Sequence, residues 1–352
     1  MKNNKKIGIL TFHWATNYGA ILQVFALQTV LQQMGCEVHI INYKPRQFDN
    51  NVWTFLRYRK FLNLRAFIHL LNKEHKMKIF RAKHLDTTPR YYTQRELRQK
   101  CEDFDVLISG SDQVLNPSFL QYGENGKSTA YYLDFGSNNT KRVCYAVSFG
   151  VTKYPNNLLE MVRPIVASID AISVREETGQ DLFIDMGRQD TIVVPDPTLL
   201  LPIDLYLKRF NITKTKKSND NYFVYMLHGK LKHIKQNLPK NICISKSETI
   251  ESWIRMIYSS KAVVTNSFHG VVFCILSHTP FLAVLSTKKN EGMNDRFFTM
   301  LTRLGLEERI TTEAEFDVNL MNKTIDWIKV DVNIRNYRNI GITFLQENIN
   351  YK

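Results

Sequence analysis

Apolar and polar positions alternate along the chain in a way that predicts strands and helices in turn. The run KKIGILTFH predicts a strand, ILQVFALQTVLQQMG has apolar residues at helical spacing and ends at Gly35, and CEVHIINY predicts a second strand. This strand–helix–strand order is typical of a parallel sheet with a right-handed crossover. Later runs predict strands that lead into polar or glycine-containing turns: DVLISG, RVCYAVSFG, AISVRE and TIVVPD.

The same alternation returns after a polar break. The segment KRFNITKTKKSNDN has no apolar period, so we expect a linker or exposed loop near residues 202–221. Beyond it, YFVYML, NICIS, KAVVT and PFLAVLS predict strands, whereas IESWIRMIYSS and HGVVFCILSH predict helices. We therefore expect an α/β protein with two Rossmann-like domains that face a cleft. The expected parts are residues 1–205 with a basic helical insert at about 46–100, residues 206–330, and a C-terminal helix over 331–352 that packs back.

Composition supports a globular chain. The 352 residues are 44% hydrophobic, and this length fits two domains. No apolar run approaches the ~18 residues of a membrane span. The start, MKNNKKIGILTFHW, lacks a long apolar core and a cleavage site, so we expect a cytoplasmic protein. Five widely spaced cysteines predict reduced thiols rather than a disulfide framework or a structural zinc site.

The net charge of +14 is unevenly distributed. Residues 46–100 contain 14 Lys/Arg and 4 Asp/Glu, a balance of +10, with aromatic residues interleaved. Three interpretations stay open: helices with a solvated basic face, a segment that rests on an anionic membrane surface or lipid-linked polyanion, and a nucleic-acid-binding region. No helix-turn-helix, zinc-finger or RNA-recognition signature supports the third, so we expect no nucleic-acid partner.

Two loops of the first half carry candidate binding residues. WATNYGA joins the first strand to the first helix, where a glycine lets the backbone approach a ligand and a helix N-terminus attracts anions. A tight turn without a ligand is the alternative. SGSDQVLNP follows a buried strand with groups that either bind sugar hydroxyls or cap a helix. The predicted acceptor-binding residues are Asn17, Tyr18, Gly19, Ser111, Asp112, Gln113 and Asn116.

A third loop, SVREETG, places an arginine at a strand end. The guanidinium of Arg175 suits a carboxylate or phosphate, and the alternative is an ion pair with Glu176 or Glu177. A fourth, TNSFHGVVF, places His269 where a strand turns into a helix. Histidine commonly transfers protons near neutral pH, although a structural histidine is the alternative. The polar neighbours of His269, namely Asn266, Ser267 and Gly270, favour an open turn.

Together these segments resemble the polysaccharide pyruvyl transferase family. The resemblance rests on GILTFHWATNYGAILQVFALQ, LISGSDQVLNP, YAVSFG, ISVREETG, VPDPTLLL, VTNSFHGVVFCILSHTPF and RFFTMLTRLGLEERI, in the family's order over roughly residues 6–310. It implies a fold like the two-domain GT-B glycosyltransferases. It also implies transfer of pyruvate from phosphoenolpyruvate (PEP) to a sugar of a capsule or exopolysaccharide, usually as a cyclic ketal, with PEP as co-substrate and no metal or organic cofactor.

The resemblance further implies residue roles. The family's histidine acid/base falls on His269 and its donor-anchoring arginine on Arg175. The family often has tryptophan at the position of Leu115, which removes a sugar-stacking ring here. Relatives often read Arg-Leu-His where this chain reads SFH, and we predict that Arg296 supplies the missing charge. The predicted donor-binding residues are Arg175, Asn266, Ser267, His269, Gly270 and Arg296.

The implied chemistry needs an acid and fixed cations. A protonated His269 would deliver a proton to carbon 3 of PEP, and Arg175 with either Arg296 or Lys288 would hold the anionic donor. If His269 is structural, His13 and His228 are the next candidates for the acid.

Two other functions stay open. A nucleotide-sugar glycosyltransferase of GT-B type would need a loop for the donor phosphates, and we find no convincing one. A non-catalytic basic protein that binds glycan or nucleic acid is disfavoured by Arg175 and His269 at separate strand ends. The acceptor is either polymeric or a polyprenyl-diphosphate-linked oligosaccharide, and the latter would bring the protein to the inner face of the cell membrane through residues 46–100.

Overall fold

The structure is a computed structural model, and it describes residues 4–49, 64–101, 103–122, 128–213, 221–227, 242–243, 249–285 and 291–349. The chain divides into two compact units, each described here by itself. Unit 1 comprises Met1–Pro197 and Phe344–Lys352, and unit 2 comprises Thr198–Thr343. The boundary therefore follows Pro197 rather than residue 205, and the C-terminal helix is divided between the two units.

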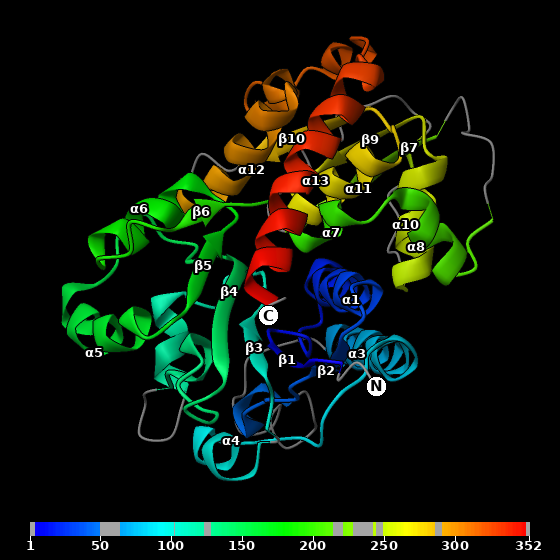
Figure 1. The fold of residues 1–352 in the computed structure, drawn as a ribbon. Helices are drawn as coiled ribbons and strands as arrows, with labels where there is room; N and C mark the ends of the chain where they lie inside the picture. Colours follow the sequence, from blue (N-terminus) through cyan, green and yellow to red (C-terminus); the bar gives the residue numbers. More distant parts are fainter. Residues whose placement is uncertain are drawn as a thin grey trace. The chain divides into compact units, whose positions relative to one another are not determined.

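Unit 1 is built on a parallel sheet with strand order β2-β1-β3-β4-β5-β6 (Figure 1). Its strands are β1 (Lys6–Leu10), β2 (Glu37–Ile40), β3 (Val106–Ser109), β4 (Lys141–Val147), β5 (Ala171–Val174) and β6 (Ile192–Val193). Its helices are α1 (Tyr18–Gln33), α3 (Leu64–His84), α4 (Gln94–Lys100), α5 (Asn156–Ala167) and α6 (Glu177–Asp185), with 3₁₀ turns η1 (Arg46–Phe48), η2 (Pro117–Tyr122) and η4 (Ala130–Tyr132). The predicted strand–helix–strand start is confirmed.

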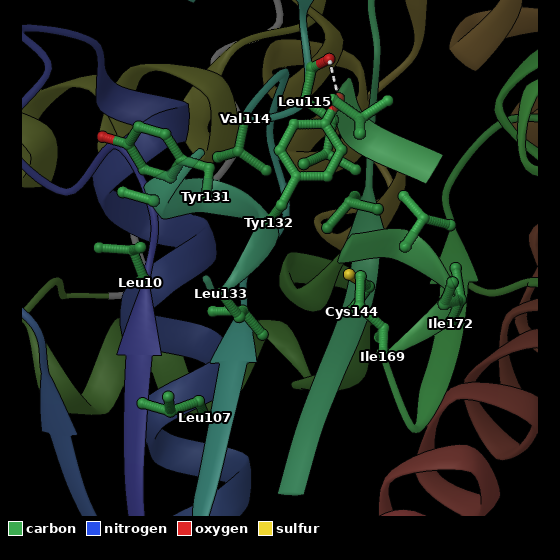
Figure 2. Packing of buried hydrophobic residues seen from close by; sticks show 14 of the residues in the cluster. Leu10, Leu107, Val114, Leu115, Tyr131, Tyr132, Leu133, Cys144, Ile169 and Ile172 are labelled. Atoms are coloured by element: carbon green, nitrogen blue, oxygen red, sulfur yellow. Dashed lines mark hydrogen bonds between the residues drawn. The ribbon is translucent and has the colours of Figure 1, made fainter. Parts of the chain in front are cut away.

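The core of unit 1 explains this arrangement. Leu10, Leu107, Cys144 and Ile172 lie on neighbouring strands and are buried together in one apolar cluster (Figure 2). Helix α1 is apolar around most of its surface and is buried over nearly its whole length, as expected for a helix that other elements enclose. The strands are short apolar runs, which is typical of parallel strands covered on both faces. Many polar side chains consequently lie at or just beyond the strand ends, although Ser173 is buried inside β5.

Unit 2 is built on a second parallel sheet with order β11-β10-β9-β7-β8. Its strands are β7 (Tyr222–Tyr225), β8 (Ile242–Cys243), β9 (Ala262–Thr265), β10 (Phe281–Leu285) and β11 (Ile310–Thr312). Its helices are α7 (Pro197–Leu200), α8 (Ile203–Arg209), α10 (Ile250–Ser259), α11 (Phe268–Leu276), α12 (Glu291–Leu304) and α13 (Trp327–Ile349), with 3₁₀ turns η5 (Glu307–Arg309) and η6 (Val318–Asn322). Helix α7 begins in unit 1, and α13 ends there. The predicted second α/β half is confirmed.

Two general features of the described residues bear on function. Among the described helices, none is long and apolar enough to cross a membrane. Cys36, Cys101, Cys144 and Cys274 are free cysteines among the described residues. Several predicted features lie outside the described residues, namely His228, Lys288 and residues 50–63 of the basic segment with their aromatic side chains.

Candidate functional site

Each sheet has a point where the strand order reverses. In unit 1, β2 and β3 flank β1 on opposite sides, so the connections after β1 and β3 diverge. In unit 2, β8 and β9 flank β7 in the same way. In open α/β sheets, ligands bind outside the carboxyl ends of the strands at such a switch point. The polar loops that the sequence singled out follow β1, β3 and β9, and therefore lie at these two points.

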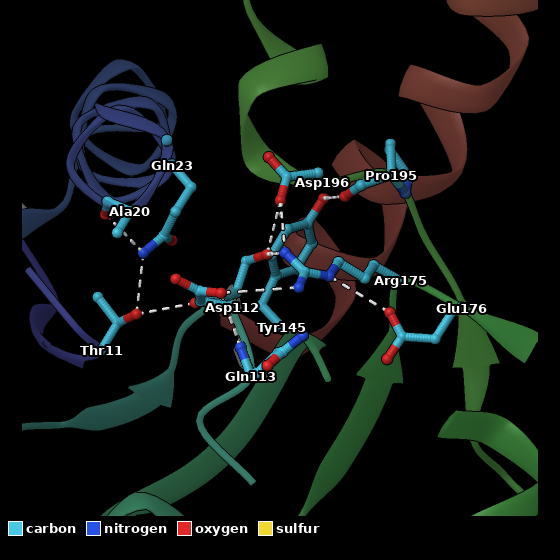
Figure 3. A network of polar contacts seen from close by, with 12 residues as sticks. Thr11, Ala20, Gln23, Asp112, Gln113, Tyr145, Arg175, Glu176, Pro195 and Asp196 are labelled. Carbon is cyan, nitrogen blue, oxygen red and sulfur yellow. Dashed lines mark hydrogen bonds and ion pairs between the residues drawn. The ribbon is translucent and has the colours of Figure 1, made fainter. Parts of the chain in front are cut away.

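A buried arginine is the centre of the polar network in unit 1. Arg175 follows β5, and its side chain is 1% exposed (Figure 3). Its Nε lies 3.3 Å from Glu176, its Nη1 lies 3.4 Å from Asp196, and its Nη2 lies 3.7 Å from Asp112. Burial lowers the pKa of Arg175, but Glu176, Asp112 and Asp196 outweigh it, so the net effect is a raised pKa. A buried cation requires partners of this kind.

Hydrogen bonds extend this network toward β1. The Ser111 hydroxyl donates to Oδ2 of Asp196 over 2.8 Å, and Thr11 donates to the Ser111 carbonyl over 2.8 Å. Gln23 of α1 donates to the Thr11 hydroxyl over 2.9 Å. These side chains are buried, and Figure 3 shows Thr11 and Gln23 beside the Arg175 group. The network consequently ties together the carboxyl ends of β1, β3 and β5 and the segment after β6.

The backbone around this network is strained at two residues that are not glycine. Asp112 has φ 96°, and Ala146 in β4 has φ 50°. At Ala146 the pairing of β4 with β5 shifts register, and the Ser173 hydroxyl bridges the break by accepting from the Ala146 N–H and donating to the Cys144 carbonyl. Residues in such conformations persist only where the surroundings enforce them, and they cluster at functional sites.

Gly150, after β4, leaves space for the Gln113 side chain of the loop after β3. Its φ is +64°, and a Cβ there would lie 2.6 Å from the Gln113 side chain. Any other residue would be strained and would displace Gln113. The backbone N–H of Gln113 donates to the Asp112 carboxylate over 2.9 Å, which restrains the Asp112 side chain.

This geometry assigns different chemistry to Asp112 and Arg175. The Asp112 side chain is 21% exposed, so its carboxylate can accept a hydrogen bond or a proton from a sugar hydroxyl. Arg175 is enclosed by three carboxylates, which favours the ion-pair alternative, with Glu176 as one partner. Its direct contact with a donor stays a prediction.

The other predicted acceptor residues are mostly used within the fold. The Asn17 side chain caps α1 by accepting from the N–H groups of Gly19 and Ala20. Tyr18 and Gly19 are buried at the start of α1. The Asn116 side chain accepts from the Ser118 N–H and hydroxyl. Asn17 is therefore a helix cap, a role that was not predicted for this loop, whereas Ser111, Asp112 and Gln113 belong to the network.

The inference about a stacking ring at position 115 needs correction. Leu115 is fully buried in the core of unit 1, where its carbonyl accepts from the Tyr132 hydroxyl over 3.4 Å (Figure 2). The Leu115 side chain packs in the core and is not exposed to a sugar. Leucine here therefore does not cost the protein a sugar-binding surface.

His13 is a weaker alternative acid than the sequence suggests. It is 3% exposed, with Nδ1 3.2 Å from the Thr11 carbonyl and Nε2 3.1 Å from the Asn42 side chain. Burial lowers its pKa to about 4, although these hydrogen bonds oppose the shift. At neutral pH His13 is uncharged and has no acidic proton of the required strength to donate.

In unit 2, the turn after β9 is organised by its own side chains. The Thr265 hydroxyl donates to the Tyr225 carbonyl over 2.6 Å and accepts from the Ser267 N–H over 3.0 Å. The Asn266 side chain accepts from the Leu227 N–H over 2.7 Å. These bonds fix the ends of β7 and β9 against each other, at the switch point of the sheet.

The start of α11 depends on Ser267 and Gly270. The Ser267 hydroxyl caps the helix by accepting from the Gly270 N–H over 3.2 Å. A Cβ on Gly270 would lie 2.9 Å from Oγ1 of Thr265, so glycine permits the close packing of helix and strand. Ser267 and Gly270 thus determine the conformation of this turn.

His269 lies in the first turn of α11, where it is 6% exposed. Its ring lies edge-on to Phe268, with the centroids 5.4 Å apart. The Arg296 guanidinium of α12 lies 5.3 Å from the centroid of that same Phe268 ring. Arg296 is therefore close to the turn, as its predicted role requires, and the role itself stays a prediction.

Sequence reasoning missed three members of the unit 1 network: Thr11, Gln23 and Asp196. Asp196 stands in the quoted segment VPDPTLLL, and its place after a strand was an available signal. Gln23 lies on an otherwise apolar helix face, and such a residue needs a buried partner. Within the described residues, no group of His, Cys, Asp and Glu side chains is placed to hold a metal ion.

Solved structures share the fold at low identity. A protein described as a UDP-N-acetylglucosamine 2-epimerase from Listeria monocytogenes is 9% identical, with TM-score 0.50 over 99% of this chain and 98% of that chain. UDP-GlcNAc 2-epimerase from Neisseria meningitidis, bound to UDP-GlcNAc, is 8% identical, with TM-score 0.49 over 98% and 99%. A glycosyltransferase from Rickettsia africae is 10% identical, with TM-score 0.47 over 99% and 100%. The fold is α/β with two Rossmann-like units, of the GT-B-like class.

Comparison with curated proteins gave no significant match. A family model does match: the one described as polysaccharide pyruvyl transferase covers residues 17–288. That range contains Asp112, Arg175 and His269, and thus the loops after β3, β5 and β9. Because the match extends over most of the sequence, the chain belongs to the polysaccharide pyruvyl transferase family.

Proposed function

We propose that this protein transfers pyruvate from PEP to a sugar of a surface polysaccharide, or of its lipid-linked precursor, and closes a cyclic ketal. One observation supports this most: a partly exposed carboxylate, Asp112, is held by the buried Arg175 at the switch point of unit 1. Such a carboxylate suits a hydroxyl acceptor. Family membership gives pyruvyl transfer as the reaction class.

The reaction balances without an oxidant or reductant. Carbon 3 of PEP takes up a proton and becomes a methyl group, which leaves carbon 2 electrophilic. One sugar hydroxyl bonds to carbon 2, the bond from carbon 2 to the phosphate oxygen breaks, and a second hydroxyl closes the ketal. One of the two hydroxyl protons returns to the protein and restores the proton that it donated to carbon 3. The other leaves with inorganic phosphate.

In unit 1 we assign the acceptor hydroxyls to Asp112. Its carboxylate would accept the hydroxyl proton as the oxygen attacks carbon 2, a step worth ~10²–10⁴ in rate. Arg175 acts as a positioning residue, because it fixes the Asp112 carboxylate without being exposed itself. Ser111 and Gln113 hold the same loop in place.

In unit 2 we assign the donor proton to His269. A helix N-terminus disfavours a charged imidazole but attracts anions such as PEP. Once bound there, the negative charges of PEP would offset the dipole and stabilise the protonated ring. Arg296 would contribute a further positive charge, because its guanidinium packs on the ring of the neighbouring Phe268. The shape of the turn depends on hydrogen bonds of Asn266 and Ser267.

The test is product analysis by mass spectrometry. The purified protein is incubated with PEP and a glycan fraction from its own source cells, and in parallel with UDP- and GDP-sugars in place of PEP. The expected result is a mass gain of one pyruvyl ketal per modified glycan, only with PEP. Transfer of a sugar from a nucleotide donor, with PEP unused, would identify the protein as a glycosyltransferase instead.

A further inference from the structure

A second cluster of polar groups lies on the β2 side of unit 1. It forms a pocket of about 350 Å³, a size that suits small-molecule ligands. Its walls come from the loop after β1 (His13, Trp14), the segment after β2 (Asn42, Lys44), helix α3 and the residues that follow α3. We call it the basic pocket. All of its lining residues belong to unit 1.

The charges of the basic pocket do not cancel. Four cations line it, namely Lys44, Lys78, Arg81 and Arg90, against the single carboxylate of Glu74. Glu74 is already paired with Arg81 over 2.6 Å and accepts from the Thr16 hydroxyl over 2.7 Å.

One further carboxylate lies next to the pocket. Asp49 pairs with Arg90 over 2.8 Å and lies 3.5 Å from the Lys44 amine. Two carboxylates thus face four cations, which leaves an excess of two positive charges around the cavity. A concave surface with such an excess concentrates anions.

Partial burial makes this excess effective. The side chains of Lys44 and Arg81 are only 12% and 13% exposed, so water screens their charges less than at the surface. Nη1 of Arg81 is buried and has no hydrogen-bond partner among the described residues. Burial also lowers the pKa of Lys44, an effect that the nearby carboxylates partly oppose and that an incoming anion would oppose further.

The remaining walls suit a sugar. The partly buried ring of Trp14 packs on Phe48 with centroids 4.6 Å apart, and the Lys44 amine lies 5.8 Å from the Trp14 ring centroid. An aromatic ring of this kind offers a flat apolar surface to a sugar ring. The Asn42 amide and the Thr87 hydroxyl offer hydrogen bonds to sugar hydroxyls.

The basic pocket is connected to the Asp112 network through one short loop. His13 contacts the Thr11 carbonyl with Nδ1, and the Thr11 hydroxyl donates to the carbonyl of Ser111, the residue before Asp112. A ligand in the basic pocket therefore contacts the same β1 loop that supports the network.

We propose that the basic pocket binds the phosphate or diphosphate group of a phosphorylated glycan, so that the acceptor of this transferase is a sugar that carries phosphate. Lys44, Lys78, Arg81 and Arg90 bind the phosphate oxygens, and Trp14 contacts the adjoining sugar ring. The assignment of this ligand as the acceptor rests on the proposed function, whereas the binding of a sugar phosphate does not.

Binding is measured by isothermal titration calorimetry without PEP, with glucose 1-phosphate, inorganic pyrophosphate and glucose as probes. The variants are Arg81→Gln and Lys78→Glu, and Lys83→Glu is the control because it is an exposed lysine of the same helix outside the pocket. Lys78 is exposed, so its replacement spares the fold. Unfolding midpoints confirm that each variant is folded.

We expect glucose 1-phosphate and pyrophosphate to bind, glucose not to bind, and both pocket variants to lose affinity by roughly tenfold or more, with Lys83→Glu like the wild type. Equal effects of Lys78→Glu and Lys83→Glu would overturn the proposal, as would equal binding of glucose and its phosphate. Binding to vesicles of phosphatidylglycerol is measured in parallel, to distinguish a lipid headgroup from a sugar phosphate. Binding to the vesicles without any binding of glucose 1-phosphate would also overturn it, and would assign helix α3 to a membrane surface.

The two proposals fail in different ways. If glucose 1-phosphate binds as described but PEP is never consumed with any glycan, the basic pocket stands and the proposed function is wrong. If PEP is consumed but the pocket variants bind glucose 1-phosphate normally, the proposed function stands and the pocket assignment is wrong.

Discussion

The carboxylate of Asp112 lies 3.7 Å from the guanidinium of Arg175, and the backbone of Asp112 is held at φ 96°. One residue is partly exposed and strained, and the other is buried and paired three times. We interpret Asp112 as the carboxylate that accepts the acceptor's hydroxyl proton, and Arg175 as the residue that positions it. This interpretation makes different predictions for the two side chains.

Arg175→Ala should mainly destabilise unit 1. Its removal would leave Glu176, Asp196 and Asp112 without their shared cation, and the loss of one partner of a buried pair costs about 3–5 kcal/mol. Urea unfolding should show this loss, whereas Arg163→Ala, an exposed arginine of the same unit, should change little. A folded Arg175→Ala protein of normal stability that selectively loses PEP affinity would instead support direct contact with the donor.

Asp112→Asn should remove activity and keep the fold. Asparagine tolerates positive φ at least as well as aspartate, so the backbone conformation is retained, but the amide is a poor base. We expect kcat to fall by ~10² or more with little change in the unfolding midpoint. The control is Asp190→Asn, which removes an exposed carboxylate paired with Arg188. Normal turnover by a folded Asp112→Asn protein would rule out Asp112 as the base.

His13 should make stability depend on pH in a defined direction. Its pKa is about 4 in the folded protein and 6.5 ordinarily, so the unfolded chain binds more protons between these values. The contribution to stability is therefore complete above pH 6.5 and declines as the pH falls toward 4. Between about pH 7 and 5 the wild type should lose about 2 kcal/mol that His13→Gln does not lose, measured by urea unfolding. Parallel losses in both proteins would contradict the buried, uncharged state of His13.

Arg296 should contribute to donor binding. Its guanidinium lies against Phe268, beside the turn that carries Ser267 where the family resemblance implies an arginine. Arg296→Ala should weaken PEP binding in calorimetry by roughly tenfold. Arg303→Ala is the matched control, because Arg303 is on the same helix but packs on Tyr337. Unchanged PEP affinity in Arg296→Ala would show that Arg296 does not replace the missing charge.

The sequence predicted the places of the candidate site better than the roles of its residues. The loops after β1, β3 and β9 were predicted because apolar runs end there in polar residues, and in a parallel sheet such ends share one edge. The pairing of Arg175 with Asp112 and Asp196 was not predicted, since these residues come from different strand ends whose neighbours only the folded sheet defines. The burial of Leu115 was not predicted for the same reason, because burial depends on how the elements pack.

The basic pocket illustrates a second limit. The sequence showed an excess of positive charge over residues 46–100 but left its meaning open. Lys44 lies just before that segment, and Arg81 and Arg90 lie on and after α3, so their convergence depends on how α3 packs beside β2. Charge patterning predicts an attraction to anions, and only tertiary structure distinguishes a pocket from a solvated helix face.

The central claim is that carbon 3 of PEP becomes a ketal methyl group through proton transfer from His269. The direct measurement is NMR of PEP labelled with carbon-13 at carbon 3, incubated with the glycan acceptor and either wild-type protein or the His269→Gln variant. For the wild type we predict that the olefinic signal converts to a ketal methyl signal in step with inorganic phosphate. His269→Gln should bind PEP within several-fold of wild type yet convert it at least ~10² times more slowly. A product that retains the olefinic carbon, free pyruvate alone, or normal conversion by a folded His269→Gln protein would contradict the account.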